Sequence, residues 1–167
     1  MDTNDKIISP FLSHIDDQGR ARMVDVSGKN ISVRRAVFES YVRLNPDTFK
    51  LVAENRISKG DVFSTARIAG IMAAKKTAEI IPLCHTLFLS FIDVGFDMRQ
   101  SDFSIRVWAE ARTASQTGVE MEALVAVQTA CMTIYDMCKA VQRDIQIDSC
   151  VLVHKSGGRS GNYNRPD

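Results

Sequence analysis

Hydrophobic and polar residues alternate most regularly in the middle of the chain. The alternation has a period of two over residues 92–98, stops at the polar residues 99–102, and resumes over residues 103–111. A period of two places every second side chain on the same face of a β-strand. Two such runs joined by a short polar turn predict an antiparallel hairpin.

Further strands are predicted on both sides of this hairpin. Residues 33–42 and residues 145–153 combine apolar content with alternation, and residues 22–27 form a shorter candidate. Helices are predicted between them from their start and stop signals. Asn45 followed by Pro46 has the form of an N-cap and a first helical residue, so a short helix is expected there.

Two longer helices are predicted as well. Asp61 is a suitable N-cap for a helix over residues 62–80, which Pro82 ends. Residues 117–120 have the spacing of a capping box, which predicts the start of the second helix. Apolar residues then recur at alternating steps of three and four, as on one helix face. They are Leu124, Val127, Cys131, Ile134, Cys138 and Val141.

From residue 32 onward the predicted order is strand, helix, strand, strand, helix, strand. This is the split β-α-β order of an α+β, ferredoxin-like fold, an antiparallel sheet with two main helices on one face. The other face would be bare without a partner, so we expect an oligomer. We expect one domain over residues 21–155, between a flexible arm at 1–20 and a flexible glycine-rich tail at 156–167. The fold does not by itself predict an activity.

Composition narrows the class of partner. The 167 residues carry 21 basic and 20 acidic side chains, a net charge of +1, so nucleic acid is not an expected partner. The first residues are too polar for a signal peptide, and no apolar run approaches the roughly 18 residues that span a bilayer. We therefore expect a cytoplasmic protein without membrane contact. The cysteines show no C-x-x-C spacing, which argues against a zinc site and a disulfide framework.

Several charged residues lie where they could act in chemistry. Lys59 precedes the helix start at Asp61, a position that favours an anion, although a surface lysine is the simpler interpretation. Asp136 and Lys139 are three residues apart, so they share a helix face. An exposed ion pair is the common outcome of that spacing. Their otherwise apolar or small neighbours instead favour partly desolvated acid–base partners.

Other polar groups have competing interpretations. Glu120 has a structural role as the third residue of the capping box, and Glu122 complements the helix dipole. His85 follows Cys84 directly, but adjacent side chains rarely face each other, so thiol catalysis is not favoured. The glycine-rich residues 156–161 either wrap phosphates or form a solvated tail.

Seven blocks of the sequence are similar, in order and spacing, to the cyclic pyranopterin monophosphate synthase family, also called molybdenum cofactor biosynthesis protein C. Several ordered blocks are more specific than any single motif. They are residues 23–27 (MVDVS), 59–63 (KGDVF), 65–71 (TARIAGI), 81–85 (IPLCH), 117–124 (TGVEMEAL), 133–142 (TIYDMCKAVQ) and 155–158 (KSGG).

The resemblance implies a ferredoxin-like homohexamer, a trimer of dimers with active sites at the dimer interface. It implies conversion of 3′,8-cyclo-7,8-dihydroguanosine 5′-triphosphate, supplied by a radical SAM enzyme, to cyclic pyranopterin monophosphate with loss of pyrophosphate. It implies no cofactor of the protein's own and leaves open whether magnesium accompanies the triphosphate.

The resemblance also implies residue roles. Asp136 corresponds to the family's catalytic aspartate, with Lys59 and Lys139 as its acid–base partners. The segments that match substrate-binding positions contain Leu83, Cys84, His85, Met121 and Glu122. Further pocket positions match Asp25, Arg34, Glu120 and Lys155, of which Arg34 and Lys155 suit phosphate.

Two residues depart from the family pattern. Thr86 stands where proline usually follows the histidine, and Arg159 stands where lysine is common, which keeps the charge but changes the geometry. Two other classes of function compete with the synthase: a nucleotide-binding or assembly module that lost catalysis, and a purely structural oligomer. The intact set of Lys59, Asp136 and Lys139 favours the synthase.

Overall fold

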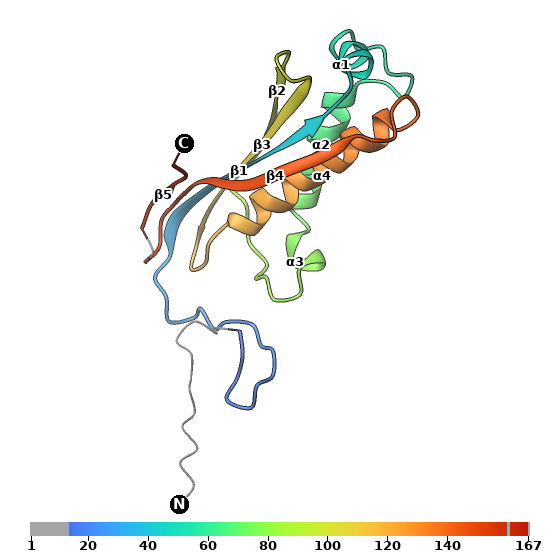
Figure 1. Cartoon of the computed structure of the whole chain (residues 1–167). Helices are drawn as coiled ribbons and strands as arrows, with labels where there is room; N and C mark the ends of the chain where they lie inside the picture. Colours follow the sequence, from blue (N-terminus) through green and yellow to red (C-terminus); the bar gives the residue numbers. More distant parts are fainter. Residues whose placement is uncertain (1–13, 160, 167) are drawn as a thin grey trace, which may run out of the picture.

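The computed structural model describes residues 14–159 and 161–166, in which one antiparallel sheet is covered by helices (Figure 1). The strand order is β2-β3-β1-β4-β5. The β-α-β-β-α-β order from β1 to β4, with β1 and β3 central, confirms the predicted ferredoxin-like α+β fold. The elements are β1 (Ser32–Arg43), α1 (Pro46–Ala53), α2 (Val62–Ala74), α3 (Thr77–Ile80), β2 (Phe91–Arg99), β3 (Ser104–Ser115), α4 (Glu120–Cys138), β4 (Gln146–Ser156) and β5 (Tyr163–Asn164).

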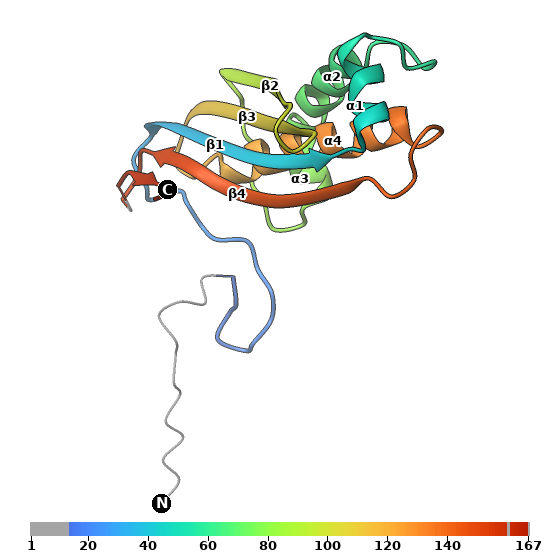
Figure 2. The same ribbon diagram turned by 45° about the horizontal axis from the view of Figure 1, so that its top comes forward.

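The period-two pattern decides which side of the sheet meets the helices. In the β2–β3 hairpin, Val94 pairs with Ala109, and both side chains are fully buried. Figure 2 shows α2 and α4 together on one side of the sheet. The hairpin prediction is therefore confirmed, including the turn between residues 99 and 104.

The predicted N-caps at Asn45 and Asp61 are confirmed. Thr48 N donates to Asn45 Oδ1 at 2.7 Å, and Ser64 N donates to Asp61 Oδ1 at 2.9 Å. Each bond satisfies one of the N–H groups that the first helical turn leaves without a partner. The Asp61 cap determines where the chain turns after Lys59.

The single helix predicted over residues 62–80 is wrong, because the chain breaks between α2 and α3. Thr77 Oγ1 donates to Ala74 O at 2.9 Å, and Lys76 N bonds to Ala73 O, three residues back. A threonine hydroxyl that bonds a nearby carbonyl competes with the helical ladder. Small residues along α2 allow α2 and α4 to pack closely, since a Cβ at Gly70 would lie 2.8 Å from Ala126 O.

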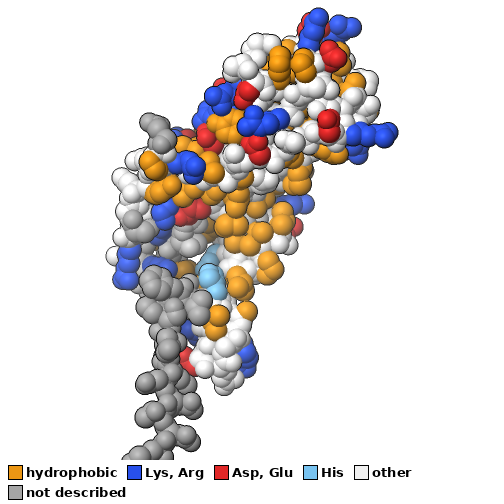
Figure 3. Space-filling view, viewed as in Figure 1, with side chains coloured by type: hydrophobic (Ala, Val, Ile, Leu, Met, Phe, Trp, Pro, Cys, Tyr) orange, Lys and Arg blue, Asp and Glu red, His pale blue; other side chains and the backbone are white. Residues whose placement is uncertain are grey.

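The sheet face away from the helices carries paired charges. Arg35 donates to both carboxylate oxygens of Glu110 at 2.8 and 2.7 Å, and Arg106 bridges Glu39 and Asp97. Figure 3 shows acidic and basic side chains interspersed over the visible face, around a group of hydrophobic ones. On the face shown in Figure 3, the charges are therefore mixed rather than sorted into one basic surface.

Residues 14–31, which precede β1, extend away from the sheet (Figures 1 and 2). The strand predicted at residues 22–27 is wrong: the backbone there forms no strand, and only an isolated bridge joins Ile15 and Ala21. A strand needs a neighbour for its N–H and C=O groups, and the described chain offers none there. Residues 1–13 of the predicted arm lie outside the described residues.

The region predicted as a tail contains β5. His154 pairs with Asn164 and Lys155 with Tyr163, so this short strand extends the sheet beside β4. Within the described residues, no helix is both long and apolar enough to cross a membrane.

Candidate active site

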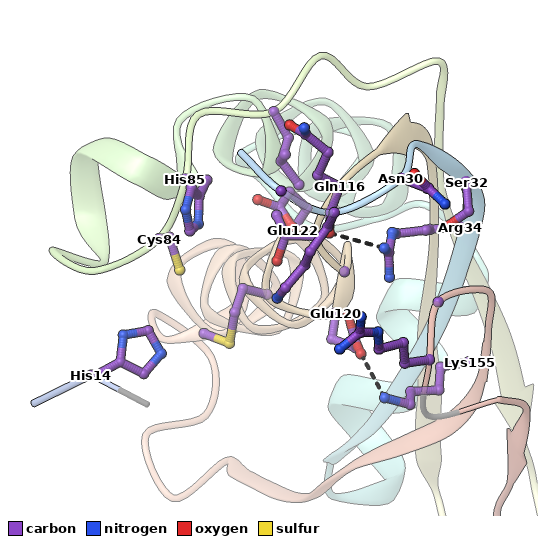
Figure 4. Close-up of a pocket in the computed structure, with 18 residues that line it drawn as sticks. His14, Asn30, Ser32, Arg34, Cys84, His85, Gln116, Glu120, Glu122 and Lys155 are labelled. Atoms are coloured by element: carbon purple, nitrogen blue, oxygen red, sulfur yellow. Dashed lines mark hydrogen bonds and ion pairs between the residues drawn. The ribbon is translucent and has the colours of Figure 1, made fainter. Parts of the chain in front are cut away.

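A cavity of about 750 Å³ lies where β1 begins, where β3 and β4 end, and where α4 starts (Figure 4). Most of its lining side chains are polar or charged. The lining residues are His14, Gly28, Lys29, Asn30, Ser32, Arg34, Cys84, His85, Leu87, Gln116, Thr117, Gly118, Glu120, Met121, Glu122, Lys155, Gly158 and Arg159.

The cavity brings together most of the residues that were expected to bind substrate. Those in its lining are Arg34, Cys84, His85, Glu120, Met121, Glu122 and Lys155. Leu83 and Asp25 are not among them. Asp25 Oδ1 instead accepts hydrogen bonds from the Ser27 backbone at 2.9 Å and from the Ser27 hydroxyl at 2.6 Å, so it closes a local turn.

Arg34 is the third residue of β1 and is anchored by two carbonyls at the end of β3 and just after it. Its Nε donates to Ser115 O at 2.9 Å, and its Nη2 donates to Gln116 O at 3.0 Å. The guanidinium has five N–H donors in one plane, so these two bonds leave the others available. The arrangement presents a fixed cation to the cavity.

Glu120 pairs with Lys155 instead of capping α4. Lys155 Nζ donates to Glu120 Oε1 at 3.1 Å, and both side chains are largely buried. Val119 is the N-cap, and it makes no side-chain cap hydrogen bond. The capping-box prediction for Glu120 is therefore wrong, because a cation on a neighbouring strand competes for the carboxylate.

Glu122 is the most perturbed acid of the cavity. The residue is 4% exposed, and its Oε2 has no hydrogen-bond partner among the described residues. Burial, with a smaller contribution from the charge of Glu120, raises the pKa of Glu122 to about 7. A carboxyl group with that pKa exchanges protons near neutrality.

The raised pKa of Glu122 leads to a pH-dependent stability. Between pH 4.5 and about 7 the folded protein keeps a proton that the unfolded chain has lost, so stability falls as pH rises through this window. We expect Glu122→Gln to raise the free energy of unfolding by about 2–3 kcal/mol at pH 8 and to change it little at pH 4. Thermal and urea unfolding at fixed protein concentration measure this difference.

The exposed Glu79 of α3 provides the matched control. Glu79→Gln should leave the pH dependence of the wild type intact. A Glu122→Gln effect of the same size at pH 4 and pH 8 would contradict the assigned pKa.

Cys84 and His85 lie in the loop between α3 and β2 and line the same cavity as Glu122. His85 Nε2 lies 2.8 Å from Val24 O, and a carbonyl only accepts, so Nε2 carries a proton and donates this hydrogen bond. Burial, together with the charge of Glu122, raises the pKa of the Cys84 thiol. Cys84 therefore stays a protonated thiol near neutral pH, which disfavours a nucleophilic role.

Sequence reasoning missed several lining residues. Lys29 and Asn30 precede β1, Gln116 lies between β3 and α4, and His14 comes from the segment before β1. No periodicity or motif in the sequence marks these residues. They meet in the cavity because strands that are distant in sequence begin or end at the same edge of the sheet. Arg159, noted above only as a departure, also lines the cavity.

Lys59, Asp136 and Lys139 form a second cluster. Lys59 Nζ donates to Asp136 Oδ2 at 2.9 Å and to Asp136 O at 2.7 Å, and Lys139 Nζ lies 2.8 Å from Oδ1. The hydrogen bond from Lys139, followed by that from Lys59, lowers the pKa of Asp136 to about 2. Asp136 is therefore an ionised carboxylate that holds two ammonium groups side by side.

The cluster and the cavity lie at opposite ends of α4. Asp136 comes sixteen residues after Glu120 on the same helix, about 24 Å along its axis at 1.5 Å per residue. One small molecule bound in the cavity cannot reach the cluster of the same chain. Most of the predicted substrate-binding residues therefore lie together in the cavity, and the three predicted catalytic residues lie together in the cluster. Within one chain, the two groups are far apart.

Metal-ligating side chains do not gather in the described part of the chain. No group of three or more His, Cys, Asp or Glu residues there has the geometry to hold an ion.

The fold and the two sites are suited to an enzyme that acts on an anionic small molecule. A cavity with anchored cations and a buried acid suits such a ligand, and the second cluster offers paired ammonium groups. The chain belongs to the MoaC family, whose sequence profile matches residues 23–158.

Curated relatives match over nearly the whole chain. A cyclic pyranopterin monophosphate synthase of Desulfovibrio desulfuricans is 54% identical over 156 residues, which are 93% of this chain and 96% of that protein. The protein of the same name from Nitratidesulfovibrio vulgaris is 54% identical over 152 residues, 91% of this chain and 94% of that protein. The one from Pelotomaculum thermopropionicum is 52% identical over 154 residues, 92% of this chain and 91% of that protein.

Proposed function

We propose that this chain is a cyclic pyranopterin monophosphate synthase of molybdenum cofactor biosynthesis. It converts 3′,8-cyclo-7,8-dihydroguanosine 5′-triphosphate, the product of a radical SAM enzyme, to cyclic pyranopterin monophosphate and pyrophosphate. The observation that carries this proposal is the family match over residues 23–158, which includes the lysine–aspartate–lysine cluster and all of the cavity lining except His14 and Arg159.

The cationic side of the cavity supports binding of the triphosphate. Arg34 and Lys155 come from the neighbouring strands β1 and β4, and Lys29 and Arg159 line the same space. The start of α4 adds the positive end of a helix dipole. These groups stabilise the negative charge that grows on the departing pyrophosphate.

Glu122 and His85 suit the proton transfers of the ring rearrangement. Opening and closing C–N bonds requires groups that give and take protons near neutral pH. Glu122 has a pKa of about 7, and the hydrogen bond from His85 Nε2 to Val24 O leaves Nδ1 of the ring for the ligand. We assign the two residues to proton transfer at the guanine-derived ring.

Closure of the cyclic phosphate needs no protein nucleophile. A sugar hydroxyl oxygen attacks the α-phosphorus, its proton passes to a base, and the bond from that phosphorus to the pyrophosphate oxygen breaks. Positioning of the reacting groups and electrostatic stabilisation of the transition state account for the rate enhancement of such a step. A Cys84 that stays a thiol is consistent with this course.

The Lys59–Asp136–Lys139 cluster reaches the substrate only from a second chain. The separation along α4 supports a site shared between two protomers, one providing the cavity and its partner the cluster. Asp136, ionised between two lysines, holds their ammonium groups for proton donation and for contact with the phosphates. Two-fold association then creates two equal sites per dimer.

Exposed apolar residues beside the cavity support this assembly. Ile31 is 70% exposed, Val33 76% and Phe88 89%, and Phe88 O accepts a hydrogen bond from Thr113 in the strand next to Arg34. Large apolar side chains grouped in this way are typical of protein contacts. We propose a cytoplasmic homohexamer, a trimer of such dimers, in keeping with four free cysteines within the described residues.

Turnover of the cyclised substrate tests the proposal. The enzymatically prepared cyclic triphosphate is added to the full chain, and pterin and pyrophosphate are measured together. The synthase forms both in equal amounts. A nucleotide-binding or assembly module would bind the compound without releasing pyrophosphate, and a purely structural oligomer would do neither, so either result would overturn the proposal.

A further inference from the structure

Gly158 lies against the guanidinium of Arg34. A Cβ built at Gly158 would overlap Arg34 Nη1 and would lie 3.1 Å from Cζ and 3.3 Å from Nη2. The overlap with Nη1 is closer than side-chain carbons allow and the other two contacts are tight, so any larger residue at position 158 excludes the present position of the guanidinium.

Two consecutive glycines bring the chain onto β1 at this point. Gly157 has a φ of +90° and Gly158 a φ of +79°, both in the region that favours glycine. A Cβ at Gly157 would overlap the backbone oxygen of Val33, whereas at Gly158 the obstacle is the end of a side chain. A substitution at Gly157 therefore displaces backbone, but a substitution at Gly158 displaces the Arg34 guanidinium.

Arg34 is thus held from two sides. The carbonyls of Ser115 and Gln116 accept from Nε and Nη2, and Gly158 leaves the space on the side of Nη1. A guanidinium pushed from that side loses its alignment with both carbonyls, because its N–H groups lie in one rigid plane. Its position in the cavity then becomes variable.

We propose that Gly158 is a positioning residue that leaves the space in which Arg34 points a fixed guanidinium at a phosphate group of the ligand. This inference rests on the proposed function, in which Arg34 binds the triphosphate. Gly158→Ala is expected to weaken binding of inorganic pyrophosphate by about ten- to a hundredfold, the size of a lost charge-assisted hydrogen bond.

Calorimetric titration with pyrophosphate tests whether Gly158 affects binding through Arg34. Gly158→Ala and Arg34→Ala are each expected to weaken binding, and the double variant should bind no more weakly than Arg34→Ala alone. Losses that multiply in the double variant would show that Gly158 acts independently of Arg34, and the inference would fail.

Gly19 provides a matched control for backbone strain. It has the same φ of +79°, and a Cβ there would meet nothing within 4 Å. Gly19→Ala should bind pyrophosphate like the wild type. An equal loss in Gly19→Ala would mean that strain alone explains the result, which overturns the inference.

A side-chain signal separates this inference from the proposed function. The Nε–H of Arg34, bonded to Ser115 O, should give an exchange-protected proton–nitrogen correlation that is missing in Arg34→Ala and shifted or lost in Gly158→Ala. If the signal shifts in Gly158→Ala while Gly158→Ala and Arg34→Ala both bind pyrophosphate normally, the positioning role of Gly158 stands and the phosphate-binding role of Arg34 fails. An unchanged signal in Gly158→Ala rules the positioning role out.

Discussion

Alanine in place of Lys139 is expected to lower the rate of pyrophosphate release by about a thousandfold or more, as is typical for a group that stabilises a transition state. Lys139 and Lys59 share the carboxylate of Asp136 at 2.8 and 2.9 Å, so removal of any member leaves the others misplaced. We expect the same loss for Lys59→Ala and for Asp136→Ala. Single-turnover assays with the cyclised substrate measure it.

The control for these variants is Lys50→Ala. Lys50 also pairs with a carboxylate on a helix, at 4.0 Å from Glu54, but lies in α1 and in neither site. The Lys50→Ala variant should turn over substrate at the wild-type rate. All four variants should keep the mass of the wild-type assembly in analytical ultracentrifugation. A folded Lys139→Ala assembly that forms product at the wild-type rate would remove Lys139 from the catalytic cluster.

Mixing two inactive variants is expected to restore activity. One variant lacks the cluster (Lys139→Ala), and the other lacks two cavity cations (Arg34→Ala with Lys155→Ala). If each site takes its cavity from one chain and its cluster from the other, as proposed, a mixed dimer contains one intact site. Random reassembly of equal amounts should recover about a quarter of the wild-type activity, since half the dimers are mixed and each has one of two sites intact.

Co-expression with two different tags gives a second route to the mixed dimers if refolding is inefficient. Each variant purified alone and then carried through the same procedure is the control. If every site were complete within one chain, the mixture would show no more activity than its two parents. That result would refute the shared site, although the synthase reaction itself could still be measured in the wild type.

Local interactions explain which elements were predictable. The alternation over residues 92–98 and 103–111 and the caps at Asn45 and Asp61 depend on neighbours along the chain, and the structure confirms them. The helix break near Thr77 was missed because a threonine hydroxyl that bonds Ala74 O has no distinct sequence signature.

Glu120 shows the limit of local reasoning most clearly. Its spacing from Thr117 predicts a capping box, yet its carboxylate accepts from Lys155, 35 residues later in the chain. The local cap and the distant cation compete for the same oxygen atoms, and a charged partner in a largely buried place is the stronger one. The spacing of residues 117–120 gives no information on Lys155, because Lys155 is distant in sequence.

The sequence by itself determined the ferredoxin-like order of elements, the family, and the types of residue available for chemistry, because these depend on short-range pattern and on residue identity. Only the tertiary structure decided that Arg34, Glu122 and Lys155 meet in one cavity while Lys59, Asp136 and Lys139 meet at the far end of α4. The physical reason is that strand pairing and helix length set distances between residues far apart in sequence.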